Sequence, residues 1–114
     1  MNAAAQAALL ASLADVELLR ERVRALVEER ERLTRALAGI SFLRPLPSRA
    51  NFILCRVVSG DARELWGKLR ERGIMVRYFD SPRLRDCLRI SVGLPEHTAA
   101  LVKALREIGG ELGI

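Results

Sequence analysis

The apolar residues of this 114-residue chain change their spacing at Gly39, and this change restricts the fold more than any other feature. Before Gly39, apolar residues recur at steps of three, four or seven, which is the spacing of one face of an α-helix. They are Val16, Leu19, Val23, Leu26, Leu33 and Leu37. After Gly39, short apolar runs alternate with turn residues, as β-strands and their connections do. The sequence therefore predicts a long helix followed by a part that contains a sheet.

The helical part has two possible beginnings. Residues 2–13 are rich in alanine and leucine and favour a helix, and Asp15 could cap or restart a helix that runs to about Ala38. We expect the apolar stripe of this helix to face a partner. A coiled coil is the alternative, but the repeat is short and Arg30 interrupts the stripe.

The second part predicts several short elements in a fixed order. Residues 40–48 contain Pro45 and Pro47, which suit an edge segment or a turn but not a central strand. Strands are expected near 51–58, 74–78 and 87–92, and helices after Asp61 and from about Pro95. This order favours an α+β fold, in which helices pack on one face of a small mixed or antiparallel sheet. The other face of the sheet is then left uncovered.

Two strand-like runs each contain one arginine, Arg77 and Arg89. Side chains alternate along a strand, so Arg89 points away from the apolar side of its run. If both strands belong to one sheet, the two guanidinium groups could meet on the uncovered face and bind a carboxylate or a phosphate. Alternatively, each arginine could pair with a nearby acid such as Asp80 or Asp86.

Charge and composition argue against several other functions. The net charge is +5, but the arginines are interleaved with acids and aromatic residues are few, so we expect no nucleic-acid partner. Cys55 and Cys87 lack metal-ligand spacing and are expected to be reduced, buried thiols without zinc. His97 lies at an expected helix start, where a solvated helix-end residue is a better interpretation than a catalytic base. No segment resembles a signal peptide or a membrane helix, so we expect no membrane association and a cytoplasmic location.

Three blocks of the sequence resemble a known enzyme family. "PSRANFILCRV", "GDARELWGKLRERGIMVRYF" and "LRDCLRISVGLPEHTAALVKAL" are similar to the C-terminal segment of histidinol-phosphate aminotransferases, which are pyridoxal-phosphate enzymes of fold type I. The N-terminal "NAAAQAALLASL" resembles the helix by which that family's chain leaves its large domain. The resemblance implies a helical segment over residues 1–38 that would connect to a large domain, and a small domain over residues 39–114.

The resemblance also implies roles for three residues. Arg89 matches the arginine that anchors the acidic group of the substrate, either the carboxylate of an amino acid or the phosphate of a phosphorylated amino alcohol. Arg77 matches a second arginine near the anionic end of the substrate. Asn51 matches a residue close to the site, although a turn or strand-entry role is the simpler interpretation.

The family's cofactor chemistry needs residues that we do not find in this sequence. Transamination needs a lysine that holds pyridoxal phosphate as a Schiff base, and an acid beside the pyridinium nitrogen. In the family these groups belong to the large domain, and neither Lys68 nor Lys103 has the family's Ser-x-x-Lys setting. We therefore expect this chain alone to bind no cofactor and to be no transaminase.

Three interpretations of the function stay open. The chain could be the small domain of a histidinol-phosphate-type aminotransferase, in histidine biosynthesis, with the complete enzyme a homo-oligomer. It could instead be a stand-alone dimerisation or interaction module that uses its first two helices. Finally, it could be the same domain of a related enzyme, such as a threonine-phosphate decarboxylase or an aromatic aminotransferase.

Overall fold

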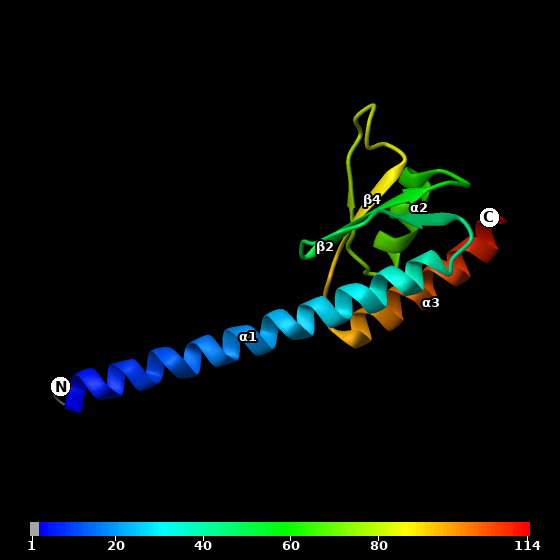
Figure 1. The fold of residues 1–114 in the computed structure, drawn as a ribbon. Coiled ribbons are helices and arrows are strands. Elements are labelled where there is room, and N and C mark those ends of the chain that lie inside the picture. The colour runs from blue at the N-terminus through cyan, green and yellow to red at the C-terminus, as the bar shows by residue number, and fades with distance from the viewer. Residues whose placement is uncertain (1–2) are drawn as a thin grey trace.

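The computed structural model describes residues 3–114, with side chains from residue 13 onward. Figure 1 shows one long helix that runs beneath a small sheet and extends well beyond it. The elements in chain order are α1 (Ala3–Ala38), β1 (Leu43–Pro45), β2 (Phe52–Val57), α2 (Ala62–Glu71), β3 (Arg77–Tyr78), β4 (Cys87–Ser91) and α3 (Pro95–Leu112). The predicted α+β order is confirmed.

The four strands form one sheet in the order β1-β2-β4-β3, and every neighbouring pair is antiparallel. The predicted edge position of the proline-containing segment is correct, because β1 has only β2 as a neighbour and ends at Pro45. Proline cannot donate a hydrogen bond to a sheet ladder and is tolerated at such an edge.

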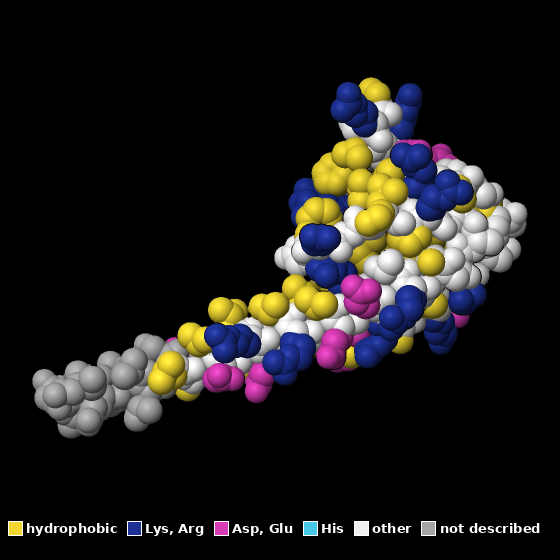
Figure 2. Space-filling model, viewed as in Figure 1, with side chains coloured by type: hydrophobic (Ala, Val, Ile, Leu, Met, Phe, Trp, Pro, Cys, Tyr) yellow, Lys and Arg dark blue, Asp and Glu magenta, His cyan; other side chains and the backbone are white. Residues whose placement is uncertain are grey.

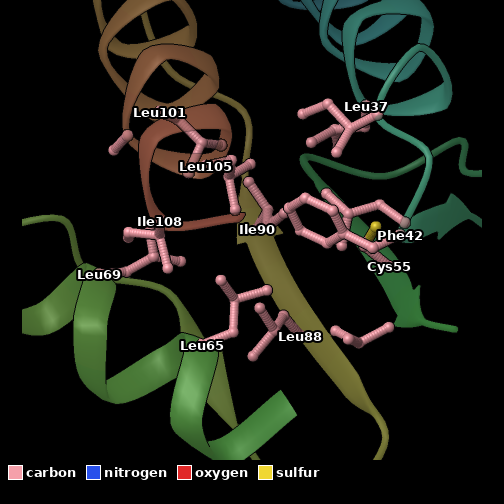
Figure 3. Close-up of a cluster of buried hydrophobic side chains, with 14 of the residues drawn as sticks. Leu37, Phe42, Cys55, Leu65, Leu69, Leu88, Ile90, Leu101, Leu105 and Ile108 are labelled. Atoms are coloured by element: carbon pink, nitrogen blue, oxygen red, sulfur yellow. The ribbon is translucent and has the colours of Figure 1, made fainter. Parts of the chain in front are cut away.

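One face of the sheet is covered by the helices and forms the core. Ile53 and Cys55 of β2 alternate toward this face, as do Leu88 and Ile90 of β4, and all four are buried. Figure 3 shows side chains of α2 and α3 converging on β4. The residues of α2 and α3 that are buried in this cluster are Ala62, Leu65, Leu69, Leu101, Ala104, Leu105 and Ile108. Their burial against the sheet supplies the main hydrophobic stabilisation of the fold.

The two halves of α1 have different environments. Leu33 and Leu37 belong to the core, with 1% and 0% of their surface exposed. The blue N-terminal part of α1 extends beyond the sheet (Figure 1). Val16, Leu19 and Val23 are exposed, and Leu19 has 61% of its surface exposed. The predicted apolar stripe is therefore covered only near its C-terminal end in this chain.

Two local predictions were inaccurate. The helix does not restart at Asp15, which lies within a continuous α1. The strand expected near 74–78 consists only of Arg77 and Tyr78, and Met75 precedes it with 76% of its surface exposed.

The predicted helix-start residues behave as expected. Asp61 precedes α2, and its Oδ1 accepts a hydrogen bond from the backbone N–H of Arg63 at 2.9 Å. His97 is exposed in the first turn of α3, and its Nδ1 accepts a hydrogen bond from the backbone N–H of Leu94 at 3.1 Å. In the part of the chain that the structure describes, no helix is long and apolar enough to cross a membrane.

Candidate anion-binding face

The register of β3 and β4 brings the two strand arginines together. Arg77 and Arg89 are Cα partners in this antiparallel pair. Residues directly opposite each other in an antiparallel sheet project from the same face, so both side chains lie on one side. Leu88 lies on the opposite, buried side with the helices. The structure therefore places both arginines on the uncovered face of the sheet, as predicted.

The rest of this face follows from alternation along the other strands. Leu54 of β2 is the partner of Arg89, and Phe52 and Arg56 share its side. Arg44 of β1 is the partner of Arg56 and extends the same surface. Figure 2 shows hydrophobic side chains bordered by Lys and Arg over the region where Figure 1 draws β2 and β4. We call this surface, formed by Arg44, Phe52, Leu54, Arg56, Arg77 and Arg89, the free face.

The two central arginines have no acidic partner within the described residues. The alternative prediction placed Asp80 or Asp86 beside them. Asp86 instead pairs with Arg56, with 3.5 Å between Oδ2 and Nε. None of the ion pairs between described side chains involves Arg77 or Arg89. Their N–H donors are consequently available to an anion from outside this chain.

Aromatic rings contact both of these arginines. The guanidinium carbon of Arg89 lies 4.0 Å from the centroid of the Phe52 ring. That of Arg77 lies 5.5 Å from the centroid of the Phe79 ring. A cation over an aromatic ring is attracted by the ring's quadrupole, and this contact uses none of the N–H donors at the guanidinium edge.

Asn51 does not join this arginine pair by register. Its side chain is exposed, and its backbone carbonyl accepts a hydrogen bond from the N–H of Val92 at 2.8 Å. Asn51 precedes Leu54, the partner of Arg89, by three positions, which corresponds to about 10 Å along a strand. The structure thus gives Asn51 a backbone role at the entry of β2.

The described residues do not fit a covalent pyridoxal-phosphate site. Lys68 belongs to α2 and Lys103 to α3, and both helices pack on the covered face of the sheet. A lysine that served the free face would have to project from the opposite side. Within the described residues, there is also no group of three or more His, Cys, Asp or Glu side chains that could hold a metal ion.

Both cysteines are free and buried. Burial raises the pKa of the Cys55 thiol to about 12, because the core disfavours a thiolate. Burial also raises the pKa of Cys87, followed by the hydrogen bond of its thiol to Asp86. Both thiols are therefore neutral and unreactive near pH 7.

Sequence comparison identifies the family. Residues 1–107 match the family model of aminotransferase class I and II. This chain belongs to that family. The histidinol-phosphate aminotransferase of Dehalococcoides mccartyi is 47% identical over 109 residues, which cover 96% of this chain and 30% of the relative. The chain thus spans about 30% of the length of the curated relatives that it matches.

Solved structures show the same fold. The histidinol-phosphate aminotransferase of Sinorhizobium meliloti in complex with pyridoxal-5'-phosphate superposes with a TM-score of 0.69 and 32% identity, over 86% of this chain and 28% of that one. The L-threonine-O-3-phosphate decarboxylase of Porphyromonas gingivalis superposes with a TM-score of 0.64 and 26% identity, over 78% of this chain and 27% of that one. In this aminotransferase-family chain, the fold predicted from the resemblance is therefore confirmed.

The contact between Phe52 and Arg89 is the feature of this face that the sequence analysis missed. Phe52 and Leu54 alternate within β2, which would have placed Phe52 on the free face. Its neighbour across the sheet depends on the register of β2 against β4, and the sequence contains no short hairpin turn between these strands that would set it.

Proposed function

We propose that this chain is the substrate-binding small domain of a pyridoxal-phosphate-dependent aminotransferase of the histidinol-phosphate type. Arg89 and Arg77 bind the acidic group of the substrate. The observation that carries this proposal is their pairing on the free face without an acidic partner among the described residues. Two arginines at opposite positions of neighbouring strands present planar arrays of donors that match a carboxylate or a phosphate.

The arrangement suits an anion that arrives from the side opposite the helices. Two cations opposite each other in a sheet repel, so a bound anion removes an unfavourable interaction as well as forming new ones. Holding the acidic group at a fixed place on a rigid sheet would orient the rest of the substrate, which is a large part of what binding contributes to catalysis.

In this proposal, the cofactor is held by residues outside those described here. Pyridoxal phosphate supplies the electron-withdrawing group for amino transfer when it is bound. This chain contributes the substrate anchor, with residues 1–38 connecting to the cofactor-binding part and residues 39–114 forming the small domain. The complete enzyme is proposed to be a cytoplasmic homo-oligomer.

Two other functions have support from particular observations. The similarity to a threonine-phosphate decarboxylase favours a related enzyme that binds a different phosphorylated substrate with the same arginines. The exposed apolar residues of α1, among them Leu19 and Val23, favour an interaction module. Sedimentation of the purified chain tests the module, because a monomer at high protein concentration would contradict it.

A chimeric enzyme tests the substrate-binding role. This chain would replace the matching 109-residue segment of the Dehalococcoides mccartyi enzyme. Arg89→Ala should lower kcat/KM for histidinol phosphate by roughly 30- to 1,000-fold, as is typical when one partner of a buried charge pair is removed. The cofactor absorption spectrum should not change. Unchanged kinetics would contradict the proposal.

The matched control for this chimera is Arg63→Ala. It removes the same charge from an exposed position on α2, away from the free face. The control should change kcat/KM less than about twofold, as expected for an exposed charge that is screened by salt. An equal loss in both variants would attribute the effect to net charge and not to the arginine pair.

The assignment of the cofactor to other residues has its own test. The purified chain is incubated with pyridoxal phosphate, reduced with borohydride and analysed by mass spectrometry. We expect no stoichiometric adduct at Lys68 or Lys103, because both lie on helices on the covered side of the sheet. One adduct per chain at a single lysine would show that the chain holds the cofactor alone.

A further inference from the structure

Arg89 contacts an aromatic ring and does not pair with an acidic side chain of the described residues. Its guanidinium carbon lies 4.0 Å from the centroid of the Phe52 ring, and no described carboxylate forms an ion pair with it. Both side chains are half-buried. The contact is therefore shielded from water on one side, which strengthens a cation–π interaction.

The sheet register brings this ring to this arginine. Phe52 is the partner of Ser91, whereas Arg89 is the partner of Leu54. Phe52 and Arg89 are consequently diagonal neighbours on the same face of β2 and β4. Such neighbours are about 7–8 Å apart at their backbones, a distance that an aromatic side chain and an arginine can span together.

Arg56 shows the other way to hold an arginine on this face. Its Nε lies 3.5 Å from Oδ2 of Asp86, and 47% of its side chain is exposed. A carboxylate partner occupies donors of the guanidinium and offsets its charge. An arginine held in this way would have to give up its partner before it bound an anionic substrate.

We propose that Phe52 is a positioning residue for Arg89. The ring keeps the guanidinium in one orientation while its five N–H donors and its full charge stay available to the acidic group of the substrate. The benefit of this orientation for substrate binding rests on the proposed function. The contact that positions Arg89 is present in this chain alone. Phe79 has the same role for Arg77. This contact is weaker, because the guanidinium carbon of Arg77 lies 5.5 Å from the centroid of the Phe79 ring.

An NMR experiment on the full 114-residue chain tests the positioning directly. The Nε–Hε signal of Arg89 is assigned by its loss in Arg89→Lys. We expect it upfield of the signals of exposed arginines, because ring currents shield protons above an aromatic ring. Phe52→Leu should move this signal to the position of a solvated arginine, and Phe52→Tyr, which keeps the ring, should not. A signal that is the same in wild type and in Phe52→Leu would overturn the proposal.

The chimeric enzyme described above tests the consequence for binding. Phe52→Leu should raise KM for histidinol phosphate by about 5- to 30-fold, the range expected for loss of a partly desolvated cation–π contact, with kcat nearly unchanged. Phe52→Tyr should restore KM to within about twofold. A residue that merely packed would be served equally well by leucine and tyrosine, so equal KM values for these two variants would overturn the positioning role.

These outcomes separate the positioning from the proposed function. If Arg89→Ala leaves histidinol phosphate use intact while Phe52→Leu still moves the Arg89 signal, substrate binding fails and positioning stands. If Arg89→Ala abolishes use of the substrate while Phe52→Leu changes neither the signal nor KM, substrate binding stands and positioning fails. Inorganic phosphate added to the isolated chain provides a second measure, since Phe52→Leu should weaken its effect on the Arg89 signal.

Discussion

The side chains on the two faces of the sheet differ in their burial and in the residues that they contact. On the covered face, Leu88 and Ile90 are 1% and 3% exposed and belong to a hydrophobic cluster that includes residues of all three helices. On the free face, Arg89 lies between them in sequence and contacts a phenylalanine ring, with no described acid as a partner. In this strand of five residues, one side thus packs in the core, and the other side presents the arginine that we propose binds a ligand.

This division has a physical reason. A buried side chain is stabilised by removal from water, and its contribution depends on close packing. An arginine that is to bind a ligand must keep unpaired donors, which a stable fold ordinarily avoids. A sheet allows both close packing and unpaired donors in one strand, because successive side chains point to opposite sides. Substitutions should therefore affect stability on one face and binding on the other.

The largest expected effect is a cavity on the covered face. Leu65 of α2 is fully buried, and Leu65→Ala should lower the free energy of unfolding by about 3 kcal/mol, measured by urea denaturation. Leu54→Ala is the matched control on the free face, where the side chain is half-buried, and should cost about 1 kcal/mol. Equal losses in the free energy of unfolding at the two positions would contradict the difference between the two faces.

Two neighbouring glycines of α3 should respond with opposite signs. A Cβ at Gly109 would lie 2.5 Å from Cε1 of Phe42, so Gly109→Ala should destabilise the chain by about 1–3 kcal/mol. A Cβ at Gly110 would meet no atom within 4 Å, so Gly110→Ala should stabilise the helix by about 0.5–1 kcal/mol. Thermal unfolding of the two variants measures both signs. Stabilisation by Gly109→Ala would show that α3 does not pack closely at this point.

The buried thiol of Cys55 makes the covered face sensitive to alkaline pH. Its pKa is raised from 9.0 to about 12 in the fold, so the neutral thiol is favoured by the native state. The associated stability is complete below pH 9 and is lost as pH rises toward 12. Between pH 8 and pH 10, wild type should lose about 1 kcal/mol more than Cys55→Ala in urea denaturation under reducing conditions. A constant difference between the two proteins would contradict the linkage.

The sequence predicted the fold well where one local pattern was sufficient. The alternation in β4 separated Leu88 and Ile90 from Arg89, and Asp61 marked the start of α2. It predicted less where the answer depended on distant parts of the chain. The contact of Phe52 with Arg89 depends on strand register, which no short hairpin turn determines here.

The apolar stripe of α1 shows the same dependence on distant contacts. Its spacing correctly predicted a helix, but periodicity cannot reveal which part of a stripe another element covers. Leu37 is buried where α1 packs against the sheet and α3, whereas Leu19 has 61% of its surface exposed. Leu19 and Leu37 belong to the same apolar repeat in the sequence. They differ only in whether the sheet extends far enough to cover them.

The smallest expected effect is also the most specific to the free face. Arg77 and Arg89 lie directly opposite each other, and like charges in this arrangement repel. Arg77→Thr should therefore raise the free energy of unfolding by about 0.2–1 kcal/mol at low salt, because it removes the repulsion and introduces a β-branched residue suited to a strand. Inorganic phosphate should stabilise wild type more than Arg77→Thr, since the variant lacks one of the two arginines of the proposed anion site. If the substitution instead destabilises the chain at low salt, Arg77 would be a structural residue. Repulsion between Arg77 and Arg89, which a bound anion would relieve, would then be contradicted.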